Sequence, residues 1–286
     1  MAISNRAALI TKTHRVLKKR YKPTPLDPAR PVLQQVLYAC CLQNARCEAA
    51  DKAFAALEKA FFDWNEIRVS TVKELAEVMD VLPDPLASAS SIKRVLQSVF
   101  EATYSFDLEF LRKENLGKAA KKLGAIDGAN KFIVSCAVQS SLGGHSIPID
   151  DGAAGVLQVI GVVSPADAQA HVAPGLERAI PKSKGIEFGS LLHQLGADFH
   201  ANCYSPVLQK VLLTINEAAR DRLPKRPSKT KKKTTKAPAK TAPTKKMAAT
   251  KSQRKAATAK GKKAPTKKKT SAKKSGSKKI SKRKPR

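Results

Sequence analysis

The chain has 286 residues and carries 54 Lys and Arg against 23 Asp and Glu, a formal net charge of +31. It is long enough to bury a core without disulfides or metal, and no apolar run reaches the roughly 18 to 20 residues of a membrane span. Its five cysteines lack the paired spacing of a secreted disulfide scaffold, so we expect a reducing, intracellular setting. The N-terminal segment lacks a sustained apolar core and a small-residue cleavage site, so we expect neither a signal peptide nor a membrane segment.

The charge is unevenly distributed along the chain. Residues 224–286 hold 27 of the Lys and Arg and neither Asp nor Glu, which leaves residues 1–223 with 27 basic against 23 acidic residues. We therefore predict a basic N-terminal arm over residues 1–23, a globular domain over 24–223 and a tail over 224–286. The arm is interpreted as a solvated leader or as a second contact to phosphates.

The globular domain is predicted to be mostly or wholly α-helical. Apolar residues recur at helical spacing from Pro31 onward, and the alternation typical of strands is nearly absent. The predicted helices cover residues 31–44, 48–62, 71–81, 88–103, a short helix after Asp107, 116–123, 129–142, 151–162, 165–180, 188–200 and 205–223.

A helix-hairpin-helix pattern stands in the middle of the domain. The predicted hairpin is Ala125, Ile126, Asp127 and Gly128, with Ile126 as its apolar plug. Small residues in such a hairpin let backbone N–H groups at the second helix's N-terminus approach a DNA phosphate, where the helix dipole favours an anion. The alternative is an ordinary turn between two helices.

A Gly-rich loop and an aspartate follow the second helix of this pattern, in the segment "LGGHSIPIDD". Here the domain resembles the endonuclease III family of DNA glycosylases, with Leu123, "AIDG" and "IPID" as counterparts of the family's leucine, hairpin and catalytic segment. "YACCLQNAR" resembles the family's "LLSAQATD". The resemblance covers about residues 31–203, and segments such as "FFDWNEIRVS" resemble an atypical bacterial, planctomycete-like branch.

The resemblance implies an all-α, two-lobed helix-hairpin-helix fold and roles for two residues. It places Asp150 on the catalytic aspartate and Gln43 on the glutamine that enters the duplex near the extruded nucleotide. A carboxylate below the sugar can stabilise positive charge as the glycosidic bond breaks, or deprotonate an attacking water or amine. The alternative role for Asp150, compatible with the first, is to cap the helix that begins near Asp151.

The chain departs from the family at the lysine that forms a Schiff base with the sugar in bifunctional members. When Ile126 and Gly128 are aligned with the family's hairpin, Ala129 or Asn130 stands at the position of that lysine, and Lys131 comes one or two residues later. Because each helical residue turns by about 100°, Lys131 points elsewhere unless the hairpin holds an insertion. The alternatives for Lys131 are therefore a nucleophile and a solvent-facing or phosphate-contacting lysine.

No cofactor is predicted. An iron-sulfur cluster of the family's 4Fe-4S kind needs four thiolates, and Cys203 is the single cysteine that could match a ligand. His193, His200 and Cys203 lack a fourth ligand for zinc, so we expect no metal site.

Two further residues have alternative roles. His145, in the Gly-rich loop, is a candidate contact to a phosphate or to the extruded base, or else a structural residue. Trp64 is interpreted as a core anchor rather than as a base-stacking residue.

The tail offers almost nothing to bury against the entropy of ordering it, so we expect it to be disordered. It resembles the Lys/Ala/Pro tails of linker histones, and a flexible cationic chain gains affinity for nucleic acid by releasing condensed counterions. We predict that it contacts DNA through lysine clusters such as Lys231, Lys232, Lys233, Lys267, Lys268 and Lys269.

These features together predict a monomeric, nucleoid-associated protein that binds duplex DNA. By resemblance it acts in base excision repair as a glycosylase on damaged bases, with the strand-nicking lyase step in doubt. The alternative is a catalytically inactive DNA-binding protein on the same scaffold. An RNA-associated protein is less favoured, because the domain lacks the aromatic-studded surfaces used for single strands.

Overall fold

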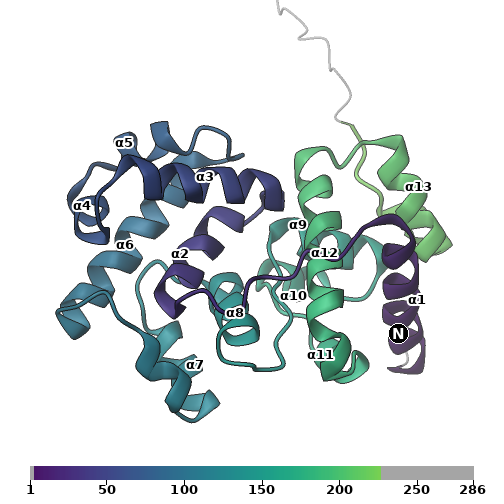
Figure 1. The fold of residues 1–286 in the computed structure, drawn as a ribbon. Helices are drawn as coiled ribbons and strands as arrows, with labels where there is room; N and C mark the ends of the chain where they lie inside the picture. Colours follow the sequence, from purple (N-terminus) through teal and green to yellow (C-terminus); the bar gives the residue numbers. More distant parts are fainter. Residues whose placement is uncertain (1–2, 227–286) are drawn as a thin grey trace, which may run out of the picture. The chain divides into compact units, whose positions relative to one another are not determined.

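The computed structural model describes residues 3–226, which form helices and connecting loops with no β-strand among them. The helices in chain order (Figure 1) are α1 Ile3–Arg20, α2 Val32–Leu42, α3 Cys47–Ala60, α4 Trp64–Val69, α5 Val72–Val78, α6 Pro85–Thr103, η1 Glu109–Lys113, α7 Leu116–Gly124, α8 Lys131–Ser140, α9 Asp151–Ile160, α10 Pro165–Gln169, α11 Leu176–Ala179, α12 Lys182–Ala201, α13 Pro206–Ile215 and η2 Glu217–Arg222. The predicted lysine clusters of the tail, Lys231 to Lys233 and Lys267 to Lys269, lie outside the described residues.

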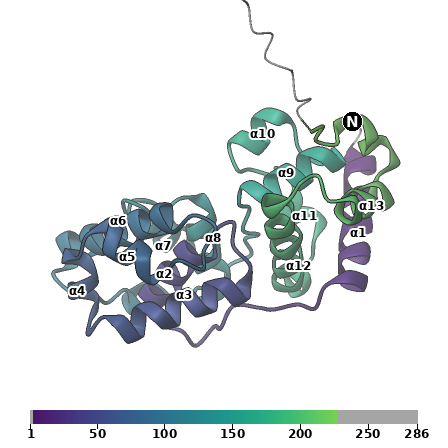
Figure 2. The same ribbon diagram turned by 90° about the horizontal axis from the view of Figure 1, so that it is seen from above.

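Two separate hydrophobic cores divide these helices into two lobes. The first core takes its buried side chains from residues 32–138, that is, from α2 through α8. The second takes them from α1 and from residues 147–219. Figures 1 and 2 show the two groups of helices, with α8 leading from the first lobe to α9 of the second. The predicted all-α, two-lobed fold is confirmed.

The N-terminal segment differs from its prediction, because α1 belongs to the second core. Its apolar side chains Ile10 and Leu17, two turns apart on one face, are 1% and 0% exposed. The helix packs against α11, α12 and α13, and Figure 2 shows it beside α13. Residues 3–20 are therefore a structural helix and not a solvated arm. Lys18 is exposed and pairs with Glu187 of α12 at 2.8 Å.

Three other helical segments differ from their predictions. The predicted helix over 165–180 is broken into α10 and α11, since His171 and Gly175 between them have φ of +52° and +79°. The predicted helix over 205–223 is likewise divided, at Asn216, into α13 and η2. No helix was predicted at α4, whose first turn is capped by Asp63 accepting from the Glu66 N–H. These segments are short, and neighbouring turns rather than long apolar faces decide where they begin and end.

The closest helix crossing in the second lobe brings α9 against α12. A Cβ on Gly152 would lie 2.1 Å from the carbonyl oxygen of Gly196, and a Cβ on Gly196 would lie 2.6 Å from the Ala153 nitrogen. The backbones can therefore approach only because both positions are glycine. This crossing fixes the first turn of α9, where the two aspartates of the "IPIDD" segment lie.

Candidate active site

The predicted hairpin joins α7 to α8 and is seated on α6. Ile126 packs partly buried against the first core, as expected of a plug. Gly128 has a φ of +88°, and a Cβ there would lie 2.7 Å from the carbonyl oxygen of Ser91. Asn130 caps α8 by accepting from the Ile133 N–H at 3.1 Å. The hairpin therefore needs its glycine for both backbone conformation and close packing.

The hairpin is also tied to α6 by charge. Arg94 donates from Nε and Nη2 to the two carboxylate oxygens of Asp127, at 2.9 and 2.7 Å. This bidentate hydrogen bonding, with the guanidinium charge, lowers the pKa of Asp127 below its ordinary value. The Ala125 N–H continues the helical pattern by donating to the carbonyl of Lys121. The DNA contacts predicted for these four hairpin residues remain predictions.

The end of α2, the start of α8 and the start of α9 meet at one cavity of about 270 Å³. At its wall the Asn130 Nδ2 donates to the Gln43 Oε1 at 2.7 Å. Asn44, Asp151 and His200 line the same cavity. Gln43 thus lies where the two lobes meet, next to the residue that caps the hairpin's second helix.

Asp150 caps α9 and is enclosed by protein. Its Oδ1 accepts from the Ala153 N–H at 2.7 Å, and its Oδ2 accepts from the Asn44 N–H at 3.3 Å. The residue is 1% exposed. The predicted capping role is confirmed, whereas the predicted catalytic role is untested.

His193 of α12 lies against Asp150 and links the two lobes. Its Nδ1 lies 3.1 Å from Asp150 Oδ2, off the direct line of a hydrogen bond, and its Nε2 donates to the carbonyl of Ala45 at 2.9 Å. Its ring stacks on Phe132 of α8, with centroids 5.7 Å apart. The Asp150 and His193 side chains therefore lie together, buried where the two lobes meet.

Asp151, one residue later, faces the cavity and was missed by sequence reasoning. Its Oδ2 accepts from Asn44 Nδ2 at 2.6 Å, and its Oδ1 lies 2.6 Å from His171 Nε2. Burial raises the pKa of Asp151, but hydrogen bonds from Asn44 and His171 and the nearby charge of His171 and His200 outweigh it, so the pKa lies below its ordinary value. The repeated aspartate in "IPIDD" was a signal for a second carboxylate at this place.

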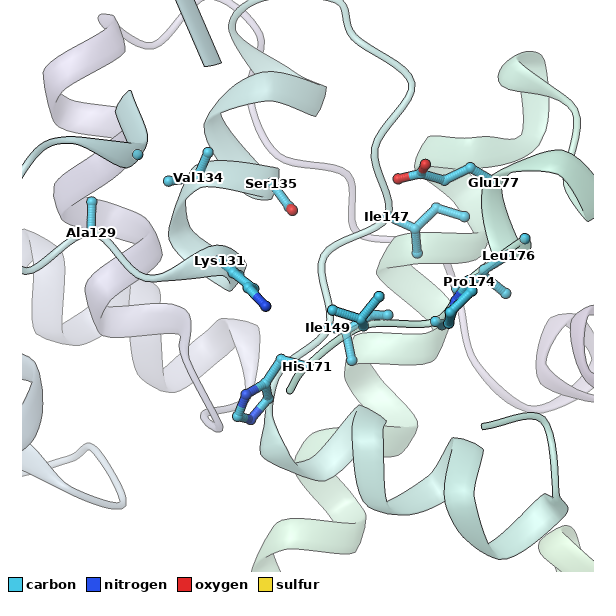
Figure 3. A pocket seen from close by; sticks show the side chains of 14 residues that line it. Ala129, Lys131, Val134, Ser135, Ile147, Ile149, His171, Pro174, Leu176 and Glu177 are labelled. Atoms are coloured by element: carbon cyan, nitrogen blue, oxygen red, sulfur yellow. The ribbon is translucent and has the colours of Figure 1, made fainter. Parts of the chain in front are cut away.

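Lys131, the first residue of α8, lines a second cavity of about 430 Å³. Its Nζ donates to the carbonyl of Ala170 at 2.9 Å. Figure 3 shows Lys131 and His171 at one end of this cavity and Glu177 at the other. Lys131 therefore lies at the seam between the lobes with its side chain exposed, and the choice between a nucleophile and a solvent-facing or phosphate-contacting lysine stays a prediction.

Comparison with known proteins bears on the fold. No protein-family model matches the sequence, and no curated protein matches it. A trapped covalent intermediate of endonuclease III with DNA, in an estranged-adenine complex, is similar with a TM-score of 0.51 and 13% identity over 78% of this chain and 100% of that one. A non-covalent endonuclease III–DNA complex is similar with a TM-score of 0.50 and 14% identity over 77% and 99%. The chain has the endonuclease III fold.

Two other residues with predicted roles, His145 and Trp64, make contacts within the protein. His145 Nε2 lies 2.8 Å from the carbonyl oxygen of Glu177 and 2.9 Å from that of Ile180, which ties the Gly-rich loop to α11. Its predicted DNA contact remains untested. Trp64 packs against the first core beside Phe54, with ring centroids 6.2 Å apart, as a core anchor would.

The cysteines of the chain do not fit the 4Fe-4S cluster found in some members of the endonuclease III family. Such a cluster needs four thiolates. Cys40, Cys41 and Cys136 are buried in the first core, Cys47 begins α3, and Cys203 alone follows α12. Among residues 3–226 no group of three or more His, Cys, Asp or Glu is arranged to hold a metal ion.

Within residues 3–226 no helix is both long enough and apolar enough to cross a membrane.

Proposed function

We propose that the helical body binds duplex DNA and releases damaged bases from it, as a DNA glycosylase of base excision repair. The observation that carries the proposal is the convergence of the ends of α2, α8 and α9 on one cavity in an endonuclease III fold. The similar solved structures are of endonuclease III with DNA. The cavity combines amides on Gln43, Asn44 and Asn130 with a carboxylate on Asp151.

The cavity supplies the groups that the chemistry requires. A glycosylase takes the target nucleotide out of the base stack and reads it by hydrogen bonds, which amide side chains can donate and accept. It then stabilises positive charge on the sugar as the glycosidic bond breaks, which a fixed carboxylate can do. The hairpin at the start of α8 would hold the DNA backbone beside the cavity.

The roles of the tail and of Lys131 complete the proposal. The Lys-rich tail would hold the protein on DNA and the nucleoid without sequence preference, while the body, acting as a monomer, inspects single nucleotides. The activity would need no cluster. A lyase step is left out, because the Lys131 amine donates to a backbone carbonyl rather than pointing alone into the cavity.

The second candidate is a DNA-binding protein that keeps this fold without the chemistry. It is favoured by the burial of Asp150, which the sequence resemblance aligns with the family's catalytic aspartate and which is 1% exposed. In that case the cavity would accept no extruded nucleotide for reaction, and the protein would only bind duplex.

The two candidates differ in base release. The purified protein is incubated with duplexes that contain oxidised or deaminated bases, and free bases are measured. A duplex with an abasic site is incubated in parallel with borohydride, which traps a Schiff base. The glycosylase releases at least one of the damaged bases, whereas binding without release from any lesion would support the second candidate. Borohydride trapping that disappears in Lys131→Ala would add a lyase step to the proposal.

A further inference from the structure

The first turn of α9 carries two adjacent carboxylates in opposite surroundings. The Asp150 side chain is 0% exposed and accepts from backbone N–H groups of Ala153 and Asn44. No water or sugar can reach its oxygens unless α2 moves away from α9. The Asp151 side chain is 51% exposed and lines the cavity that Gln43 and Asn130 also line.

Asp151 is held in place from both lobes. Asn44, at the end of α2, donates from Nδ2 to Asp151 Oδ2 at 2.6 Å and accepts from the Asp151 N–H at 3.1 Å. His171 lies 2.6 Å from the other carboxylate oxygen. A carboxylate fixed at both oxygens needs little reorganisation when a charge develops near it.

His171 is itself held in an unusual backbone conformation. Its φ of +52° is uncommon for a residue with a side chain. Its ring reaches Asp151 across 20 residues, and the residue lines the 430 Å³ cavity together with Lys131. The pair therefore connects the two cavities at the seam between the lobes.

We propose that Asp151, and not Asp150, is the carboxylate that faces the sugar of the extruded nucleotide, and that His171 is a positioning residue for it. This inference rests on the proposed function. The glycosidic C1′–N bond breaks and its electron pair leaves with the base. A water oxygen bonds to C1′, one water proton passes to Asp151, and that proton is then returned to the nitrogen of the departing base.

The test measures binding and requires no turnover. The full chain is titrated with a duplex carrying a pyrrolidine analogue of an abasic nucleotide, whose ring nitrogen is cationic, and with a duplex carrying the uncharged tetrahydrofuran analogue. The ratio of the two affinities reports a negative charge next to the sugar. We expect the wild-type protein to prefer the cationic analogue by about tenfold or more, since opposite charges attract strongly in a partly desolvated site.

Five variants test which carboxylate supplies the charge. Asp151→Asn reduces the preference to about twofold or less, and Asp151→Glu restores part of it. Asp150→Asn keeps the preference. Asp221→Asn, an exposed carboxylate in η2, makes the same change in net charge and also keeps it. His171→Gln lowers the preference while leaving the affinity for the uncharged analogue within about twofold, which a general loss of structure would not do.

Several outcomes overturn the assignment. A preference lost in Asp150→Asn and kept in Asp151→Asn would return the role to Asp150. A wild-type protein without preference, or without binding to either duplex, would remove the carboxylate from the sugar altogether. If Asp150→Asn fails to fold, the contrast between Asp151→Asn and Asp151→Glu decides. The proposed function can fail while this assignment holds. That outcome would be a charge preference that depends on Asp151 together with no base released from any lesion-containing duplex.

Discussion

At the end of α2, Asn44 combines a left-handed backbone with the hydrogen bonds that join the lobes. Its φ is +58°, and its side chain makes three hydrogen bonds to the first turn of α9. Asparagine tolerates this conformation better than other residues with a side chain. One residue thus turns the chain out of α2 and fixes Asp151.

Replacing Asn44 should therefore weaken the fold. We expect Asn44→Ala to lower the free energy of unfolding by about 1 to 3 kcal/mol, through the missing hydrogen bonds and the strained φ. Asn44→Gly should recover the part that comes from φ. Denaturant unfolding of both variants measures the two contributions. Asn5→Ala, at an exposed position near the start of α1, is the control, and equal stabilities of all four proteins would contradict this role for Asn44.

Asp151 should make stability depend on pH. Its pKa in the folded protein lies below the ordinary value of 3.8, so folding favours the charged form. This contribution is complete above about pH 5 and is lost as the pH falls through the lowered pKa. Wild type and Asp151→Asn are compared at each pH, so that contributions shared by both proteins cancel. The difference in unfolding free energy should shrink between about pH 5 and pH 3, and a difference that stays constant would rule out the shift.

At the level of elements, the crossing of α9 and α12 depends on glycine. A Cβ at Gly196 would lie 2.6 Å from the Ala153 nitrogen and 3.1 Å from Asp150 Oδ1. Gly196→Ala should cost about 1 to 3 kcal/mol of stability through overpacking. Gly124→Ala is the matched control, since a Cβ there meets nothing within 4 Å, and it should be neutral or slightly stabilising. Thermal unfolding compares the two, and equal effects would show that the crossing can relax.

The long helices and the hairpin could be predicted from the sequence because their signals are local. Ile126 and Gly128 occupy a turn whose apolar plug and glycine are read from four residues. The packing of α1 could not be predicted, since Ile10 and Leu17 find their partners on α11, α12 and α13, more than 150 residues away. The basic residues around them masked a short apolar face.

The candidate site was predicted in part for a similar reason. Gln43 and the "IPIDD" segment were found from local motifs, and the structure brings both to the seam between the lobes. The pairing of Asp151 with His171 crosses an irregular connection in which the chain turns at a positive φ. No periodic pattern marks such a connection, so no sequence signal joined the two residues.

At the level of the whole molecule, charge and chemistry are predicted to lie in different segments. Residues 224–286 carry 27 positive charges, whereas residues 1–223 carry 27 basic and 23 acidic residues. Truncation after Leu223 should flatten the dependence of duplex affinity on salt, by about 0.9 in the log–log slope for each phosphate that the protein no longer neutralises. Titrations from low to moderate salt measure the slope, and an unchanged slope would remove the tail from DNA binding.

Base release by the truncated chain addresses most directly whether the helical body is a glycosylase. Full-length protein and the chain ending at Leu223 are each saturated with the lesion-containing duplexes at low salt, and free bases are quantified in a single turnover. We expect both to release the same base at similar rates, because the cavity lies within the helical body. Saturated binding by both proteins with no base released from any lesion would contradict this and leave a protein that only binds DNA.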